Sequence, residues 1–295
     1  MNSTIKGILY ILTSALAFAA STVFAKLINN QSSIPGIEIT FFRFSTGFFL
    51  VLTWMLLMKE SFRPVRFRYV FLRGLFNTVA VIFFFMGIER TTVTHANMLN
   101  MTYPVFVFMM APFLNGERNT PANYLYLALT MAGVYLIVVP DFKAVNPGDI
   151  FALLSGITAG GAISTLREAR KYDSSSVILL YLMGMGALIN LFIVLPVFIM
   201  PGGLMAFYMV LHVACALLGQ LTLTVGYRHV EASTGSLVSS SRILFAGMMG
   251  VIFFADPLTE KVLAGGALIV LSLTGVSGIL NRFFGRRERV EEPPS

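Results

Sequence analysis

The sequence predicts an all-α integral membrane protein with ten transmembrane helices, arranged as two inverted five-helix repeats. Three observations support this prediction: the chain is 56% hydrophobic and only 12% charged, its apolar residues fall in long blocks, and it resembles itself at an offset near 140 residues. A soluble domain carries about 25% charged residues. A helix of about twenty residues rises roughly 30 Å, the thickness of the hydrocarbon core of a bilayer.

Ten apolar segments follow one another along the chain, separated by short loops that contain Pro, Gly and Asn. Their approximate bounds are 6–28, 36–58, 69–88, 93–115, 121–140, 148–169, 175–199, 205–226, 232–255 and 259–281. The first segment has no small-residue cleavage site after a short apolar core. We therefore interpret it as a retained span and not as a signal peptide.

The distribution of Lys and Arg predicts the orientation of these spans. If the amino terminus is cytoplasmic, 15 of the 21 basic residues fall on the inner side and 4 on the outer side, and the other two, Arg43 and Arg242, lie within spans. The sequence thus predicts a multi-pass protein of the cell (cytoplasmic or inner) membrane with both termini in the cytoplasm. The net charge of +7 does not predict nucleic-acid binding, because the basic residues lie in short loops and form no long arm.

The internal repeat divides the chain into 1–141 (spans 1–5), 142–283 (spans 6–10) and a polar cytoplasmic tail, 284–295. Gly7 to Ser14 matches Gly148 to Ser155, and Met86 to Ile88 matches Val225 to Tyr227. Because each repeat has an odd number of spans, the second copy must enter the membrane from the opposite face. Inverted repeats of this kind are typical of secondary transporters and favour alternating access. The alternative is a duplicated membrane scaffold that transports nothing.

Several short motifs carry a family resemblance that covers nearly the whole chain. They include Phe41-Phe42-Arg43-Phe44, Leu72-Arg73-Gly74, Gly116-Glu117, Ser241-Arg242 and Ala255-Asp256. On these residues the chain resembles EamA-type transporters of the drug/metabolite transporter superfamily, with two EamA repeats, and it is similar to a subgroup that includes S-adenosylmethionine carriers. Two positions depart from the family pattern: Ile243 occupies the position that matches Pro104, and Ala255-Asp256 replaces a Gly-Glu pair.

Arg43 and Arg242 are the strongest candidates for substrate binding. A charged side chain inside the hydrocarbon core of the membrane costs at least about 2.5–3.5 kcal/mol, so it needs a partner or a water-filled cavity. A guanidinium presents a planar fork of donors to a carboxylate. The two arginines therefore favour a solute with a carboxylate, such as an amino acid or another zwitterion. In the structural alternative, Arg43 bonds to Glu38 or to helix-end carbonyls, Arg242 ties spans together, and the solute is neutral or cationic.

Other polar groups at similar depth are predicted to complete the site. They are Asn77, Asn100, Tyr103, Gln220, Tyr227 and Ser239. Two pairs are related by the repeat, Asn100 with Ser239 and Tyr103 with Arg242, which favours a shared site on the fourth and ninth spans. The alternative for each residue is a hydrogen bond between helices, worth about 0.6 kcal/mol on average.

Acidic residues lie only at the ends of spans. Glu117 and Asp256 end long apolar runs and are interpreted as gate or structural anchors, as is Glu38. No carboxylate is placed for a proton or sodium relay of the usual kind. Exchange, facilitated diffusion or weak coupling through Glu38 is therefore favoured.

The predicted function is a secondary transporter of a small metabolite. A membrane-embedded enzyme is the competing class, but the three His residues are scattered and no phosphate loop or nucleophile elbow is present. Neither a cofactor nor a metal site is predicted, because the single cysteine, Cys215, cannot build a thiolate cluster. The expected partners are the solute and the lipid bilayer, and a homodimer is compatible with the sequence.

Overall fold

The computed structural model describes residues 3–91, 93–138 and 147–277, and the regular structure of these residues is helical throughout. The first half contains α1 (Ser3–Gln31), α2 (Gly36–Leu57), α3 (Phe67–Ile88), α4 (Val93–Asn100), α5 (Tyr103–Asn115) and α6 (Pro121–Val138). The second half contains α7 (Pro147–Ala169), α8 (Ser175–Val194), the 3-10 turn η1 (Leu195–Val197), α9 (Gly203–Gly226), α10 (Ala232–Ser239), α11 (Arg242–Phe254) and α12 (Glu260–Val276). The predicted tail 284–295 lies outside the described residues.

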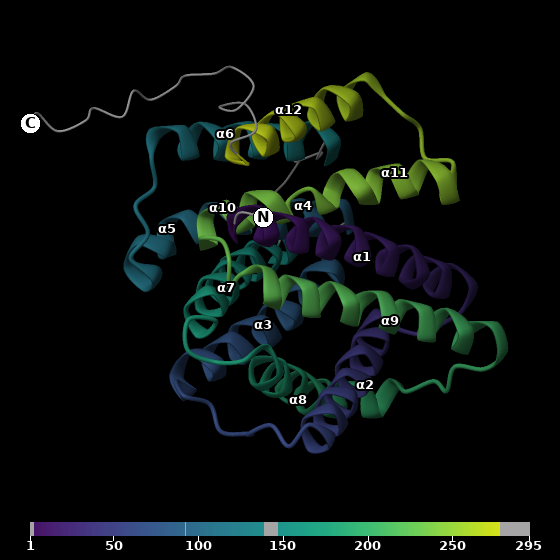
Figure 1. Ribbon diagram of the computed structural model, residues 1–295. Coiled ribbons are helices and arrows are strands. Elements are labelled where there is room, and N and C mark those ends of the chain that lie inside the picture. Colours follow the sequence, from purple (N-terminus) through teal and green to yellow (C-terminus); the bar gives the residue numbers. More distant parts are fainter. Residues whose placement is uncertain (1–2, 92, 139–146, 278–295) are drawn as a thin grey trace, which may run out of the picture.

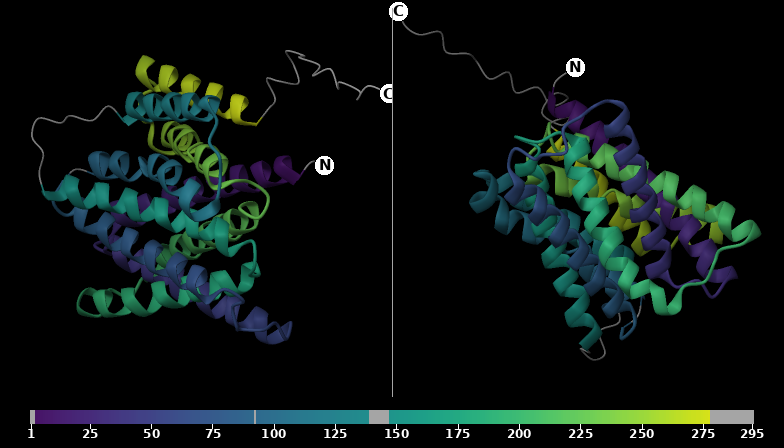
Figure 2. Two further views of the ribbon diagram at one scale, coloured as in Figure 1. Left: turned by 90° about the vertical axis from the view of Figure 1, so that its left-hand side faces the viewer. Right: turned by 90° about the horizontal axis from the view of Figure 1, so that it is seen from below.

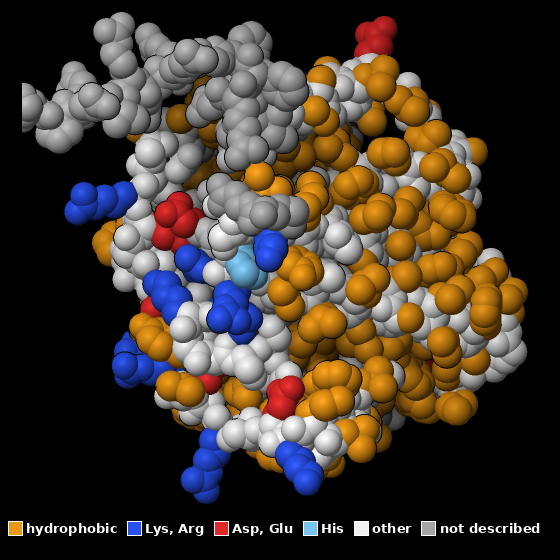
Figure 3. Space-filling view, in the orientation of Figure 1, with side chains coloured by type: hydrophobic (Ala, Val, Ile, Leu, Met, Phe, Trp, Pro, Cys, Tyr) orange, Lys and Arg blue, Asp and Glu red, His pale blue; other side chains and the backbone are white. Residues whose placement is uncertain are grey.

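The described part of the chain contains nine segments long and apolar enough to cross a membrane. Two of them join consecutive helices, α4 with α5 and α10 with α11. Helix α12 is the predicted tenth span and has 17 described helical residues. Figure 3 shows apolar side chains covering one broad part of the surface, while Lys and Arg gather towards the left and lower edges. These helices and this apolar surface are those of a multi-pass membrane protein.

The helices pack in pairs that exchange under the internal repeat. Figures 1 and 2 show α6 beside α12 at one end of a stack of helices and α2 beside α8 at the other. Between them, α3 packs on α7 and α1 packs on α9. If each helix is replaced by its counterpart in the other half, α3–α7 becomes α9–α1, and the two outer pairs map onto themselves. Packing thus follows the pseudo-two-fold relation that the sequence predicts.

Successive spans cross the membrane in alternating directions, which places the start of α1, the start of α3 and the ends of α7 and α9 on one face. In the structure these helix ends lie in contact. The Ser3 hydroxyl at the start of α1 lies 3.0 Å from His229 Nδ1, just after α9. The backbone N–H of Val65, before α3, donates to the Asp173 carboxylate after α7 over 2.5 Å. The face that carries these contacts is the one predicted to be cytoplasmic.

The fourth and ninth spans are broken in the middle, whereas the sequence predicted continuous helices. Asn100 ends α4 and Ser239 ends α10, and these two residues are 139 positions apart. The helices that follow begin at Tyr103 and Arg242, which are also 139 positions apart. Pro104 lies in the first turn of α5, where its missing N–H leaves no helical bond unmade. Ile243 occupies the matching place in α11, so the second break forms without proline.

Both broken spans end on a residue with left-handed backbone. Gly116, after α5, has a φ of 67°, and Ala255, after α11, has a φ of 53°. Glycine adopts this conformation freely, whereas an L-residue incurs roughly 1–2 kcal/mol. The alanine at 255 therefore makes the end of α11 less favourable than the end of α5.

The α6–α12 pair is held by two glycines that face each other. A Cβ on Gly133 would lie 2.6 Å from the Gly265 carbonyl oxygen, whereas a Cβ on Gly266 would meet only a Leu244 methyl group at 3.5 Å. We expect Gly133→Ala to separate the helices and to lower the Tm of the purified protein by several degrees. Gly266→Ala, the control, should leave the Tm unchanged or raise it, because alanine is the better helix former. Equal Tm values for both variants would contradict this packing.

Candidate functional site

The breaks in the fourth and ninth spans bring several predicted site residues together near the middle of the molecule. Arg242 begins α11, and its guanidinium donates to Thr22 Oγ1 of α1 over 3.3 Å and lies 5.3 Å from the centre of the Phe18 ring. Arg43 of α2 is near enough for the two positive charges to repel each other. Its guanidinium lies 4.6 Å from the centre of the Phe44 ring.

Neither arginine has a carboxylate partner among the described residues. Arg43 forms no hydrogen bond or ion pair there, and its Nε is buried. Glu38, the partner considered in the structural alternative, instead accepts a 2.9 Å bond from the backbone N–H of Ile199. The alternative in which Glu38 holds Arg43 is therefore wrong. Two neighbouring guanidiniums without a counter-ion form a site suited to an anionic group.

His212 of α9 belongs to the same group, although the sequence analysis did not select it. Its Nδ1 lies 3.0 Å from both the hydroxyl and the carbonyl oxygen of Ser21 in α1. The charges of Arg43 and Arg242 both act on the ring. The α1–α9 pair thus supplies a third nitrogen-bearing side chain beside the two arginines.

Tyr103 and Ser239 join the two breaks directly. The Tyr103 hydroxyl makes a short hydrogen bond with the Ser239 hydroxyl and also donates to the carbonyl oxygen of Ser236 over 3.3 Å. Tyr103 begins α5 and Ser239 ends α10, so this contact links the first half of the chain to the second. Arg242 acts electrostatically on Tyr103 and so adjoins this link.

Glu117 closes the structure on the face predicted to be cytoplasmic. Its side chain accepts bonds from the backbone N–H groups of Ala232 (2.5 Å) and Ser233 (3.0 Å) and from the Ser233 hydroxyl (3.0 Å). These N–H groups belong to the first turn of α10, which has no partners for them within the helix. Glu117 is only 8% exposed, so it caps α10 from the end of α5 in a nearly dry position.

On the opposite face, the described residues show no equivalent contact. Helix α5 packs against α10, but the pair related to it by the repeat, α4 and α11, has no packing of comparable extent in the described residues. Asp256, the repeat equivalent of Glu117, caps no helix there: its side chain is half exposed and lies 3.8 Å from Lys26 Nζ. A Cβ added to Gly247, on α11, would meet only open space. The broken spans therefore pack against each other on one face, whereas α4 and α11 show no comparable packing in the described residues on the other.

Tyr227 and Arg73 lie under the closed face. The Tyr227 ring is fully buried below α10, where a Cβ on Gly235 would come within 2.5 Å of it, and its hydroxyl has no hydrogen-bond partner in the described residues. Tyr227 also adjoins Tyr103 and Arg73 electrostatically. Arg73 was counted with the loop charges, but it lies within α3 and is only 2% exposed. Its Nε is buried and has no hydrogen-bond partner among the described residues.

Arg73 and His212 could have been found from the sequence. They are 139 residues apart, the same offset that relates Met86 to Val225. The repeat therefore places a basic side chain at equivalent points of α3 and α9, one towards each face.

The three remaining candidates make no hydrogen bond to either arginine among the described residues. The Asn100 amide donates to Ser155 Oγ of α7 over 2.9 Å, which is the interhelical bond considered as its alternative. Asn77 is partly exposed, with no hydrogen bond among the described residues. Gln220 is buried and its Nε2 lacks a partner there. Within the described residues, no group of three His, Cys, Asp or Glu side chains could hold a metal ion.

Comparison with known proteins agrees with this architecture. A family model described as the EamA-like transporter family matches residues 5–139 and 146–278. One crystal structure superimposes with a TM-score of 0.80 at 17% sequence identity and covers 96% of this chain and 99% of its own. At that identity the likeness concerns the fold alone.

Curated relatives that are 23–29% identical match most of this chain. The pseudopaline exporter CntI of Pseudomonas aeruginosa strain UCBPP-PA14 is 24% identical over 92% of this chain and 95% of its own. An uncharacterised transporter of Archaeoglobus fulgidus is 29% identical over 88% and 92%. Human solute carrier family 35 member G1 is 23% identical over 92% of this chain and 78% of its own. All three carry names of transporters, and none carries the name of an enzyme.

Proposed function

Because the chain belongs to the EamA-like transporter family, we propose that this membrane transporter carries a small metabolite by alternating access. The halves 1–141 and 142–283 would act as the two inverted units. The observation that carries the proposal is the asymmetry of the broken spans, with α5 held against α10 at one face and α4 apart from α11 at the other. A protein built of two inverted copies can exchange these arrangements and so open to the opposite side.

The substrate class that we propose is a metabolite with a carboxylate, either anionic or zwitterionic and amino-acid-like. The charge of Arg242 acts on Arg43, neither has a carboxylate partner among the described residues, and a substrate carboxylate would supply the missing negative charge. Phe18 lies beside the Arg242 guanidinium and would contact the apolar part of the solute, while the buried Phe44 ring supports Arg43 from the α8 side. Tyr103 and Ser239 would bound the site on the closed side.

We also propose that the closed face is cytoplasmic and that the protein lies in the cytoplasmic membrane with both termini inside. The excess of Lys and Arg on the predicted inner side supports this orientation. The conformation described here would then be open to the outside. Transport would proceed by exchange or facilitated diffusion, because the described membrane spans place no Asp or Glu near their midpoints.

Uptake into liposomes tests the function. We expect the purified protein to show saturable flux of a labelled amino acid or of another carboxylate-bearing metabolite, recovered chemically unchanged. A changed product would favour the membrane enzyme, and no flux across a panel of carboxylated, neutral and cationic solutes would favour the scaffold. Concentrative uptake driven by acidification would contradict the absence of a proton relay.

A further inference from the structure

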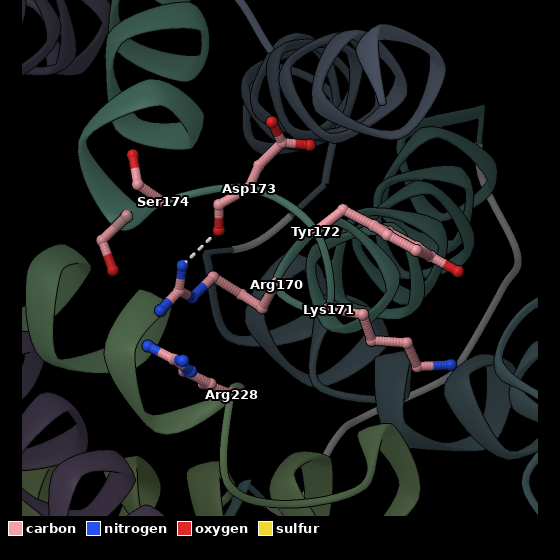
Figure 4. A pocket seen from close by; sticks show the side chains of 7 residues that line it. Arg170, Lys171, Tyr172, Asp173, Ser174 and Arg228 are labelled. Atoms are coloured by element: carbon pink, nitrogen blue, oxygen red, sulfur yellow. Dashed lines mark hydrogen bonds between the residues drawn. The ribbon is translucent and has the colours of Figure 1, made fainter. Parts of the chain in front are cut away.

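A polar pocket of about 340 Å³ lies on the face predicted to be cytoplasmic, apart from the Arg43–Arg242 site. Its walls are residues 170–175, which connect α7 to α8, and Arg228, which follows α9. Figure 4 shows the guanidiniums of Arg170 and Arg228 facing each other across it, with the side chains of the α8 start at its edge. We call this site the arginine pocket.

The two arginines of the pocket lack a carboxylate partner among the described residues. Arg170 is only 7% exposed and is held by the carbonyl oxygens of Thr224 (3.0 Å) and Asp173 (2.5 Å). Burial, and then the charge of Arg228, lower the pKa of Arg170 to about 10, so it remains protonated at pH 7. Arg228 is exposed, and its side chain makes no hydrogen bond or ion pair with the residues that the structure describes.

The one carboxylate in the wall is engaged elsewhere. The Asp173 side chain points away from Arg170 in Figure 4 and accepts the backbone N–H groups of Val65 (2.5 Å) and Arg66 (3.1 Å). Lys171 also points away and pairs with Glu168 over 2.6 Å. The Asp173 carboxylate still acts on Arg170 through its charge, but Arg170 and Arg228 are the guanidiniums that remain to bind a ligand in the pocket.

Further donors surround the two guanidiniums. Ser174 and Ser175 line the pocket at the start of α8, a helix of 20 residues; the Ser174 hydroxyl accepts the N–H of Val177 over 3.3 Å, and the N–H groups of Ser175 and Ser176 have no partner inside the helix. Basic residues also converge nearby: burial and the charges of Arg228, Lys6, Arg170 and Arg167 lower the pKa of His229. The positive electrostatic potential that these basic residues create favours an anion with several acceptor oxygens.

We propose that the arginine pocket binds a phosphate group, carried either by a free phosphate compound or by the headgroup of an anionic phospholipid. Paired guanidiniums match the oxygens of a phosphate, and serine hydroxyls and helix N-termini complete its coordination. The volume admits a phosphate together with part of the group attached to it. The cytoplasmic leaflet supplies anionic lipids at the depth where this face is predicted to lie.

The bound phosphate would add a link between two turns that Arg167 already connects through its bonds to the carbonyl oxygens of Tyr227 and Arg228, both 3.0 Å. Arg170 belongs to the α7–α8 connection, and Arg228 lies four residues before Ala232, whose N–H is held by Glu117. Occupation of the pocket would thus brace the turn that leads into α10 and favour the closed face.

The test measures the Tm of the full-length protein in detergent, in potassium phosphate and in potassium chloride of equal ionic strength. A parallel set uses nanodiscs of phosphatidylcholine alone or mixed with phosphatidylglycerol. Arg228→Gln removes one guanidinium that makes no hydrogen bond among the described residues. Loss of this guanidinium should weaken phosphate binding by roughly tenfold or more. Arg118→Gln, an exposed arginine on the same predicted face, is the matched control.

The expected result is a ligand-dependent rise in Tm for the wild type and Arg118→Gln that is lost in Arg228→Gln. A rise with inorganic phosphate assigns the pocket to free phosphate compounds, and a rise only with phosphatidylglycerol assigns it to a lipid headgroup. Equal responses of the wild type and Arg228→Gln to both ligands would overturn the proposal. A response lost in Arg242→Gln but kept in Arg228→Gln would place the anion at the Arg43–Arg242 site and also overturn it, while the proposed transport function would stand.

Discussion

Replacing Arg242 by Gln weakens the binding of a carboxylate-bearing substrate by roughly 10- to 100-fold, and the ligand-free protein keeps or gains stability. The first effect follows from the loss of a charge-assisted hydrogen bond, worth about 1.5–3 kcal/mol. The second follows from the relief of repulsion between Arg242 and Arg43. The measurement is the Tm of wild type and variant across a series of substrate concentrations.

Two further variants sharpen the assignment of Arg242. Arg242→Lys keeps the charge but loses the planar fork of donors, so substrate affinity should fall between those of the wild type and Arg242→Gln. Arg118→Gln changes an exposed arginine and should match the wild type throughout. If Arg242 merely ties α11 to Thr22, the ligand-free Tm should fall in Arg242→Gln while the substrate shift persists, and the binding role would be wrong.

Removing the Glu117 side chain opens the face that is closed in this structure. Glu117→Ala leaves two N–H groups of the first turn of α10 and the Ser233 hydroxyl without their acceptor. Because these are bonds to a nearly buried carboxylate, we expect the equilibrium to shift towards opening of this face by roughly tenfold or more. Glu117→Gln, which keeps one carbonyl acceptor, should have a smaller effect.

Labelling of a buried cysteine measures this opening. Ser236 lies in α10 and is fully buried, so Ser236→Cys in a Cys215→Ala background reports when the helix moves away. The labelling rate should rise in Glu117→Ala. It should stay unchanged in Asp256→Ala, the repeat-equivalent control, because the half-exposed Asp256 carboxylate lies 3.8 Å from the similarly exposed Lys26 Nζ and an ion pair of this kind contributes little. Equal labelling with and without Glu117 would show that other contacts keep α10 in place.

The fold was largely predictable because lipid imposes simple rules on a sequence. Apolar length located the spans, and the odd number of spans in each repeat predicted that the halves are inverted. The 139-residue offset even paired Tyr103 with Arg242 before the structure placed both directly after a break. These features depend on local composition or on self-similarity, which one sequence contains.

The contacts of the site were less predictable, because they depend on which side chain of a distant helix lies opposite. Asn100 has the same polarity and depth as Ser239, yet its amide is bonded to Ser155. Arg73 resembled a loop charge because it lies only six residues from the start of α3, but packing buries it. Glu117 was correctly placed at the end of a span, while its partner, the start of α10, is more than a hundred residues away.

The hydroxyl contact between Tyr103 and Ser239 has an electrical consequence. It joins the break in the fourth span to the break in the ninth span, and so links the first half of the chain to the second. If the ends of the broken spans move about this contact, opening one face requires closing the other, and no continuous water column connects the two solutions. A cell could then hold many copies of this protein without dissipating its membrane potential through them.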